Sequence, residues 1–288
     1  MYAFVKQQAF GNDFVVIDSR TEPVVLSPEA VRAIADRRFG VGCDQLVVLR
    51  PPPADAPDAD ALLQIFNGDG GEVEACGNAT RAIARTLMDE AGRSNVTLIS
   101  RGGRLACRSA PGGMVTVDMG LAQLDWRDIP LRDPVDTLAV PLGVEGVPDA
   151  VAVNIGNPHA VIFVDDALAV PLDRLGPQIE RLSLFPDRTN VEFAHLVGPD
   201  RVRMRIWERG AGITGASGSG ACATAVAAAR RGLTGRQVQV VFDAGSLAID
   251  WLDNGRVEMT GGAQTSFSGR LDPSLIAAAD ADAGRPAA

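Results

Sequence analysis

The sequence predicts an α/β (α+β) protein made of two similar domains. Its 288 residues are about the length of two domains, and 46% hydrophobic with 22% charged residues is typical of globular proteins. A unit in which an apolar strand enters a glycine-rich loop and leaves as an alanine-rich helix occurs twice. A shift of 141 residues lays Ile65 on Ile206, Gly71 on Gly212 and Cys76 on Ser217. We therefore expect one structural unit used twice.

Each copy of the unit has a short turn directly before its helix, Cys76-Gly77-Asn78 in the first and Ser217-Gly218-Ser219 in the second. The first backbone N–H groups of a helix have no intrahelical partner and lie at the positive end of the helix dipole, so they attract anions. Two such termini facing each other would hold one carboxylate, with a thiol and a hydroxyl beside it. A purely structural strand-to-helix turn is the alternative for a single copy, and the repetition favours a site.

The remaining elements also follow a repeated order. A hairpin around Gly11-Asn12-Asp13 opens the first half, and a similar hairpin around Gly156-Asn157-Pro158-His159 opens the second. A helix begins at Ser27-Pro28, where Ser caps the helix and Pro takes its first position. The proline-rich residues 120–150 suggest a crossover between domains. Helices are further expected over residues 77–90, 172–182 and 218–231, and strands over 3–6, 14–18, 46–49, 62–66, 96–100, 104–108, 114–119, 150–155, 160–164, 189–193, 202–207, 238–242, 247–252 and 256–260.

Composition excludes several classes of function. A net charge of −9 with interspersed signs argues against nucleic-acid or anionic-membrane partners. No apolar stretch approaches the roughly 18 residues of a membrane span, and the N-terminus lacks the order of a secretory signal, so a cytoplasmic location is expected. The four cysteines show no paired CxxC spacing, so neither a metal site nor a disulfide framework is expected at Cys43, Cys76, Cys107 and Cys222.

Five motifs in the same order and spacing make the whole chain resemble the diaminopimelate epimerase family. They are Gly11-Asn12-Asp13-Phe14, Gly40-Val41-Gly42-Cys43-Asp44-Gln45, Ala75-Cys76-Gly77-Asn78-Ala79-Thr80-Arg81, Gly156-Asn157-Pro158-His159 and Glu208-Arg209-Gly210-Ala211-Gly212. The resemblance implies two pseudo-symmetric domains, each a curved mixed or antiparallel sheet around a central helix, with the active site in the interdomain cleft. The domains would be 1–121 plus 265–288, and 122–264.

The resemblance also implies a reaction and its residues. The family interconverts LL- and meso-diaminopimelate in lysine and peptidoglycan precursor synthesis without a cofactor, as a homodimer. Cys76 would be one acid/base thiol, and His159 and Glu208 would tune the thiols. The N–H groups of Gly77, Asn78, Gly218 and Ser219 would hold the α-carboxylate. The other polar groups of the substrate would be held by Asn12, Gln45, Asn67, Asn157, Asn190, Glu208 and Arg209.

Ser217 departs from the family, which has its second catalytic cysteine at this position. A hydroxyl is far less acidic than a thiol, so Ser217 keeps nearly the shape of the family's residue but cannot reach the same ionised population at the same helix terminus. Three explanations remain open. The first is a natural or engineered Cys-to-Ser change in an otherwise intact epimerase. The second is a substitute thiol, Cys43 or Cys222. The third is another activity on the same fold, either a one-base isomerase or racemase of another substrate or a silent amino-acid-binding protein.

Overall fold

The computed structural model describes residues 2–74 and 76–277, and the chain divides into two compact units. The first unit runs from the N-terminus to Val115 and resumes at Gly262, and the second spans Thr116–Gly261. The domain boundaries expected from the sequence lie a few residues farther along the chain. Ala75 of the third motif and residues 278–288 lie outside the described residues.

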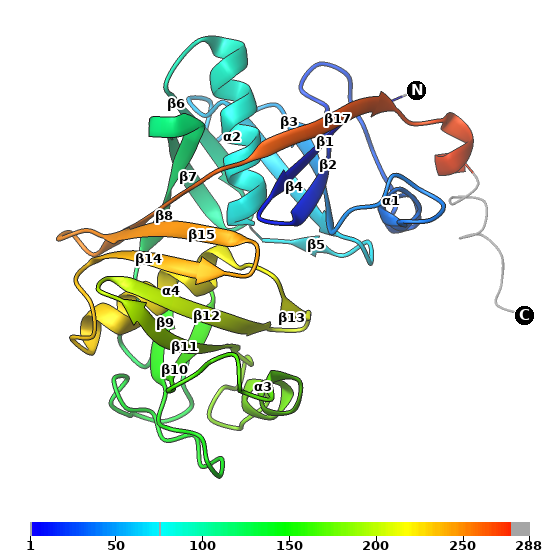
Figure 1. Ribbon diagram of the computed structural model, residues 1–288. Coiled ribbons are helices and arrows are strands. Elements are labelled where there is room, and N and C mark those ends of the chain that lie inside the picture. The colour runs from blue at the N-terminus through cyan, green and yellow to red at the C-terminus, as the bar shows by residue number, and fades with distance from the viewer. Residues whose placement is uncertain (1, 75, 278–288) are drawn as a thin grey trace, which may run out of the picture. The chain divides into compact units, whose positions relative to one another are not determined.

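The first unit is built on a mixed sheet with the strand order β17-β1-β2-β3-β4-β6-β7, and the short strand β5 folds back on β4 (Figure 1). Only β2 with β3, and β4 with β6, run parallel among these pairs. The strands are β1 Ala3–Ala9, β2 Asn12–Asp18, β3 Gln45–Arg50, β4 Ala61–Asn67, β5 Glu72–Val73, β6 Asn95–Ser100, β7 Gly103–Ala110 and β17 Gln264–Arg270.

The second unit repeats this sheet as β9-β10-β11-β12-β14-β15-β16-β8, with β13 folding back on β12. Its parallel pairs are β10 with β11 and β12 with β14. The registers repeat as well, because Ile65 pairs with Val73 in the first unit and Ile206 with Thr214 in the second. The strands are β8 Met114–Leu121, β9 Val151–Asn154, β10 Pro158–Phe163, β11 Asn190–Gly198, β12 Arg201–Glu208, β13 Gly212–Thr214, β14 Gln237–Phe242, β15 Gly245–Trp251 and β16 Arg256–Gly261.

Each sheet curves around one helix. Helix α2 (Gly77–Ala91) contacts β1, β6 and β7, and helix α4 (Gly218–Arg230) contacts strands along the whole second sheet, from β9 to β16. A helix can contact strands near both edges of a sheet only if the sheet bends around it, and the ribbon shows this wrapping in each unit (Figure 1). The predicted fold of two pseudo-symmetric units with central helices is confirmed.

Helices α1 and α3 cover the outer faces of the sheets. Helix α1 (Pro28–Ala35) packs on β3, and its first turn is capped by the Ser27 hydroxyl, which accepts from Ala30 N at 3.0 Å. Helix α3 (Leu172–Glu180) packs on β11, β12 and β13. Because α3 and α4 cover opposite faces, the first five residues of β11 are all buried. Polar side chains on this strand are therefore held deep in the protein.

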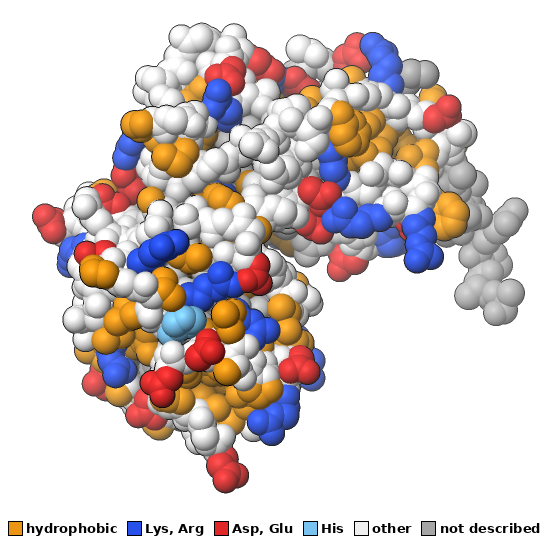
Figure 2. Space-filling view, viewed as in Figure 1, with side chains coloured by type: hydrophobic (Ala, Val, Ile, Leu, Met, Phe, Trp, Pro, Cys, Tyr) orange, Lys and Arg blue, Asp and Glu red, His pale blue; other side chains and the backbone are white. Residues whose placement is uncertain are grey.

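The structure differs from the sequence prediction at a few short elements. The glycine-rich loops contain the short strands β5 and β13, and residues 264–270 form β17 beside β1. His159, expected in a turn, lies inside β10, which begins at Pro158 because proline is tolerated at the first residue of a strand. In the described part of the chain, no helix has both the length and the apolar character to cross a membrane. On the face drawn in Figure 2, acidic and basic side chains are interspersed.

Candidate active site

The strands of the first unit bring three of the predicted binding residues to one edge of the sheet. Asn12 begins β2, Gln45 begins the parallel strand β3, and Asn67 ends the antiparallel strand β4. The register pairs Gln45 with Asn67 directly, and Gln45 Nε2 donates to Asn67 Oδ1 at 3.0 Å. Residues separated widely in the sequence thus share one polar edge.

Cys76 lies at the N-terminus of α2 next to this edge. It has extended backbone angles and its Sγ accepts from Ala79 N at 3.5 Å, so it is the N-cap of the helix. Its Sγ also lies 3.8 Å from Asn12 Oδ1, which accepts from Asn78 Nδ2 at 3.2 Å. The fully buried Arg81 donates to Asn78 Oδ1 at 2.7 Å and fixes that amide. We call Asn12, Gln45, Asn67, Cys76 and Asn78 the first half-site.

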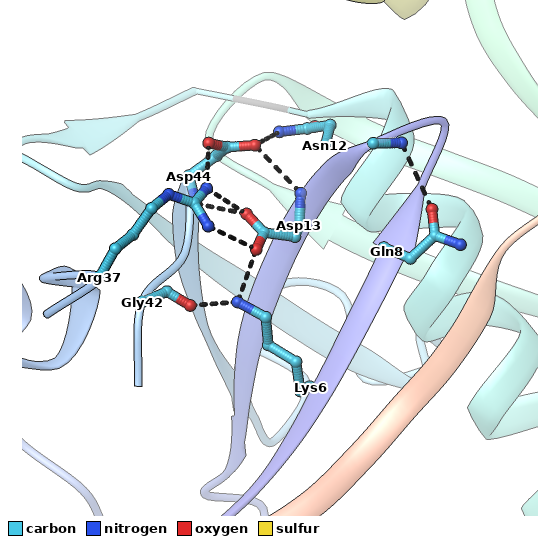
Figure 3. A network of polar contacts seen from close by, with 8 residues as sticks. Lys6, Gln8, Asn12, Asp13, Arg37, Gly42 and Asp44 are labelled. Carbon is cyan, nitrogen blue, oxygen red and sulfur yellow. Dashed lines mark hydrogen bonds and ion pairs between the residues drawn. The ribbon is translucent and has the colours of Figure 1, made fainter. Parts of the chain in front are cut away.

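A network of charged residues holds Asn12 in place (Figure 3). Asn12 Nδ2 donates to Asp44 Oδ2 at 3.0 Å, Arg37 bridges Asp44 and Asp13, and Lys6 Nζ lies 2.7 Å from Asp13 Oδ2. Burial alone would raise the pKa of Asp13, but hydrogen bonds from Arg37 and Lys6 outweigh it and hold the pKa far below its usual range. Sequence reasoning missed this network, although Asp13 and Asp44 lie inside two of the quoted motifs.

The second unit gathers the corresponding residues at the equivalent edge of its sheet. Asn190 Oδ1 accepts from Arg209 N at 2.9 Å, and Asn190 Nδ2 donates to Pro158 O at 2.9 Å. Asn157 lies in the turn before β10, with its Oδ1 2.8 Å from His159 Nε2. The exposed Arg209 side chain donates to Asp187 O at 3.0 Å. Each of these predicted residues is thus anchored within its own unit.

Ser217 occupies the place in α4 that Cys76 occupies in α2. It has extended backbone angles, and its hydroxyl accepts from Gly220 N at 3.4 Å, as Cys76 does from Ala79. Glu208, at the end of β12, accepts a short hydrogen bond from the Thr214 hydroxyl. Burial raises the pKa of Glu208, and hydrogen bonds from Thr214 and Ser217 oppose that rise without cancelling it. Asn157, Asn190, Glu208, Arg209 and Ser217 form the second half-site.

Glu192 is a buried carboxyl that sequence reasoning missed. Its Oε1 lies 2.6 Å from His159 Nδ1, and both side chains are 0% exposed. Burial raises the pKa of Glu192, and the adjacent His159 opposes the rise. A charged residue between the apolar Val191 and Phe193 was the available signal, because charged residues are almost never fully buried unless paired.

The first turns of α2 and α4 contain the four predicted backbone donors. Gly77 and Asn78 are the first two residues of α2, and Gly218 and Ser219 are the first two of α4. At these positions a helix provides no carbonyl partner for the N–H group, and the side-chain caps bond only the third residue. Each half-site therefore contains a helix terminus suited to a carboxylate.

The two candidate substitute thiols are both buried. Cys43 is 5% exposed within an apolar cluster of the first unit, and burial raises its pKa to about 11. Cys222 is fully buried within α4. A thiol with so high a pKa holds little thiolate at neutral pH, so Cys43 is a poor base. Among the described residues, no cluster of three or more His, Cys, Asp or Glu side chains is arranged for a metal ion.

Comparison with known proteins identifies close relatives. The family model for diaminopimelate epimerase matches residues 4–124 and 151–266. A diaminopimelate epimerase from Rhodospirillum centenum is 55% identical over 95% of this chain and 93% of its own length. Another from Erythrobacter litoralis is 49% identical over 94% of this chain and 97% of its own.

Solved structures show the same fold at low identity. A predicted epimerase from Pseudomonas aeruginosa has a TM-score of 0.66 at 20% identity, covering 94% of this chain and 99% of that one. A hydroxyproline epimerase from Agrobacterium vitis also has a TM-score of 0.66, at 15% identity and covering 96% and 97%. A methylitaconate-delta-isomerase has a TM-score of 0.61 at 12% identity, covering 93% and 94%.

Proposed function

The chain belongs to the diaminopimelate epimerase family, and we propose that it interconverts the LL and meso forms of 2,6-diaminopimelate by proton transfer at Cα, with Ser217 limiting the rate. One observation carries this proposal. Cys76 and Ser217 are equivalent N-caps of two equivalent helices, each with its oxygen or sulfur accepting from the third residue of the helix. A repeated pair of acid/base groups is what inversion at a carbon needs.

In the proposed reaction the two half-sites bind one substrate. Inversion requires one group to remove the Cα proton from one face and another to return a proton to the opposite face. Cys76 serves one face and Ser217 the other. The α-carboxylate lies between the two helix termini, whose donors and dipoles stabilise the negative charge that develops as the proton leaves. Those donors are the N–H groups of Gly77, Asn78, Gly218 and Ser219.

The remaining predicted residues bind the substrate or tune the acid/base groups. Glu208 takes the Ser217 hydroxyl proton as the Ser217 oxygen removes the proton from Cα, and the raised pKa of Glu208 makes its carboxylate a stronger proton acceptor. His159 tunes the acid/base pair from within the second unit, where its Nε2 lies 2.8 Å from Asn157 Oδ1. The polar groups of the substrate are held by Asn12, Gln45, Asn67, Asn157, Asn190, Glu208 and Arg209.

The replacement Ser217→Cys tests the proposal. A thiol at this helix terminus restores an acidic partner to Cys76, so epimerisation should rise by at least about a hundredfold, within the usual range for one acid/base group. The measurement is isomer conversion and deuterium at Cα, starting separately from LL- and meso-diaminopimelate in deuterated water. Ser27→Cys is the matched control, because it makes the same chemical change at the N-cap of α1, outside both half-sites.

The same assay separates the alternatives. No gain from Ser217→Cys would contradict a rate limited by Ser217. In the unmodified chain, deuterium entering from one isomer only, without conversion, would show that Cys76 works alone on one face. Tight binding without any exchange would instead indicate an amino-acid-binding protein. Faster exchange with a different amino acid would indicate a racemase or isomerase of that substrate.

The resemblance extends the proposal to the state of the protein. We propose a cofactor-independent homodimer in the cytoplasm, with no pyridoxal phosphate. Two acid/base groups and a stabilised carboxylate supply the proton transfer without an electron sink, which supports independence from the cofactor. Sedimentation equilibrium of the full chain measures the dimer, and a monomer at assay concentration would overturn that part of the proposal.

A further inference from the structure

The buried pair Glu192 and His159 marks a difference between the two units. The register pairs Phe14 with Gln45 in the first unit and His159 with Asn190 in the second, so His159 occupies the place of Phe14. Val47 lies two residues after Gln45 on β3, and Glu192 lies two residues after Asn190 on β11, so Glu192 occupies the place of Val47. Phe14 and Val47 are fully buried, so the fold accepts an apolar pair here. Stability alone does not require a polar pair at this position, since apolar replacements of buried ion pairs are often neutral or stabilising.

The structure makes room for the carboxylate. A Cβ on Gly220 of α4 would lie 3.1 Å from Glu192 Oε1 and 2.7 Å from Ile206 Cδ1. The equivalent position of α2 is Ala79, and the residue equivalent to Glu192 in the first unit is the smaller Val47. Glu192 Oε2 is buried and has no hydrogen-bond partner among the described residues. Of the two carboxyl oxygens, only Oε1 is hydrogen-bonded, and its partner is His159.

The hydrogen bonds fix the position of one proton. His159 Nδ1 lies 2.6 Å from Glu192 Oε1, and His159 Nε2 lies 2.8 Å from Asn157 Oδ1. An amide oxygen only accepts hydrogen bonds, so Nε2 carries a proton in this arrangement. Glu192 matches this arrangement in two forms of the pair, which both hold two protons: a neutral carboxyl group that donates to Nδ1 of a neutral ring, or a carboxylate that accepts from Nδ1 of a doubly protonated ring, and Nε2–H is present in both. With its oxygen held by His159, the Asn157 amide offers its two N–H donors to a ligand.

We propose that Glu192 is a positioning residue that acts through His159 to present the N–H donors of Asn157 to a carboxylate of the substrate. This rests on the proposed function, in which Asn157 binds diaminopimelate. Without the carboxyl group, neutral His159 can carry its proton on either nitrogen. When Nε2 is unprotonated, the Asn157 amide can flip so that its NH₂ group donates to Nε2. The flipped amide then presents its oxygen to the substrate carboxylate, and the two oxygens repel each other.

The first arm of the test needs no variant and no substrate. The full chain is labelled with ¹⁵N in its imidazole rings, and the two histidines are assigned by His195→Gln. At neutral pH, His159 Nε2 is expected to carry a proton, as its hydrogen bond to Asn157 Oδ1 requires. An unprotonated Nε2 in the unmodified chain would overturn the proposal.

The second arm uses Glu192→Val, which copies the residue found at the equivalent place in the first unit. The variant is expected to show a mixture of His159 tautomers and to bind meso-diaminopimelate at least roughly tenfold more weakly by calorimetry, as for the loss of one hydrogen bond to a charged group. Weaker binding with the His159 tautomer unchanged, or unchanged binding with mixed tautomers, would contradict the proposal. If the unmodified chain binds no diaminopimelate, the proposed function fails while the tautomer readout still stands.

A matched control removes another buried carboxyl from the same unit. Glu180 is 1% exposed and accepts from Trp207 Nε1 at 2.7 Å, on the opposite face of the sheet. Glu180→Gln should leave the ¹⁵N spectrum of His159 unchanged, because it does not touch the Glu192–His159–Asn157 chain. A changed His159 spectrum in this control would mean that the ring responds to the loss of any buried carboxyl group, and this would contradict a specific role of Glu192.

Discussion

At the scale of the residue, Ser217 has a structural task that is separate from its chemistry. Its hydroxyl satisfies the N–H of Gly220 in the first turn of α4. Replacing an N-cap serine with alanine typically costs about 0.5–2 kcal/mol. Because this bond is long at 3.4 Å, we expect Ser217→Ala to lower the free energy of unfolding by about 0.5–1 kcal/mol, measured by urea denaturation.

The thiol variant supplies the comparison for this prediction. Cys76 caps α2 with the same geometry, at 3.5 Å from Ala79 N. Ser217→Cys should therefore remain close to the unmodified chain in stability while Ser217→Ala does not. Equal stability of all three proteins would show that the side chain contributes no capping energy, and Ser217 would then matter only for chemistry.

At the scale of the element, the approach of α3 to β12 depends on one glycine. A Cβ on Gly176 would lie 2.5 Å from Cγ and 2.6 Å from Cδ2 of the Trp207 ring. Alanine normally stabilises a helix relative to glycine by about 1 kcal/mol, but the ring is rigid and Trp207 Nε1 is tied to Glu180. We expect Gly176→Ala to lower the free energy of unfolding by about 1–3 kcal/mol, the usual cost of overpacking.

The same variant should also displace Glu208 of the second half-site, because Trp207 immediately precedes Glu208 on β12.

Gly215→Ala is the control for the stability measurement, since a Cβ there meets nothing within 4 Å. Chemical denaturation of both variants separates the clash from a general effect of losing a glycine. A stabilised Gly176→Ala protein would mean that α3 can move away from β12 without loss.

At the scale of the whole molecule, the two units should respond to acid in opposite directions. The pKa of Asp13 in the first unit is lowered, so its contribution to stability is present above the unfolded value of 3.8 and is lost as pH falls below it. The pKa of Glu208 in the second unit is raised, so its contribution is fully present below the unfolded value of 4.5 and is lost as pH rises. Below pH 3.8 the first unit should therefore unfold first.

Intrinsic fluorescence makes this measurable. All three tryptophans, Trp126, Trp207 and Trp251, lie in the second unit, whereas circular dichroism reports both units. In an acid titration, the loss of helical signal should begin at a higher pH than the change in tryptophan fluorescence. Asp13→Asn should reduce the gap between the two transitions. Coincident transitions in the unmodified chain would show that the two units unfold together and would contradict the prediction.

The sequence predicted the elements whose signals are local. The Ser27 cap, the helices after Cys76 and Ser217, and most strands follow from apolar periodicity and from capping chemistry, and the structure confirms them. The strands β5 and β13 were missed because they are very short and pair only by folding back on β4 and β12. The place of His159 was wrong for a related reason, since proline at a strand start looks like a turn in the sequence.

The sequence by itself determined the repeat, its two helix termini and the change from thiol to hydroxyl, because each depends on residues that are adjacent or regularly spaced along the chain. Only the tertiary structure decided which side chains meet. Glu192 lies 33 residues from His159, and Asp44 lies 32 from Asn12, yet neighbouring strands bring each pair into hydrogen-bond contact. Burial raises the pKa of Glu208 and of Cys43, which makes Cys43 a poor thiolate, and burial is a property of packing that no local pattern contains.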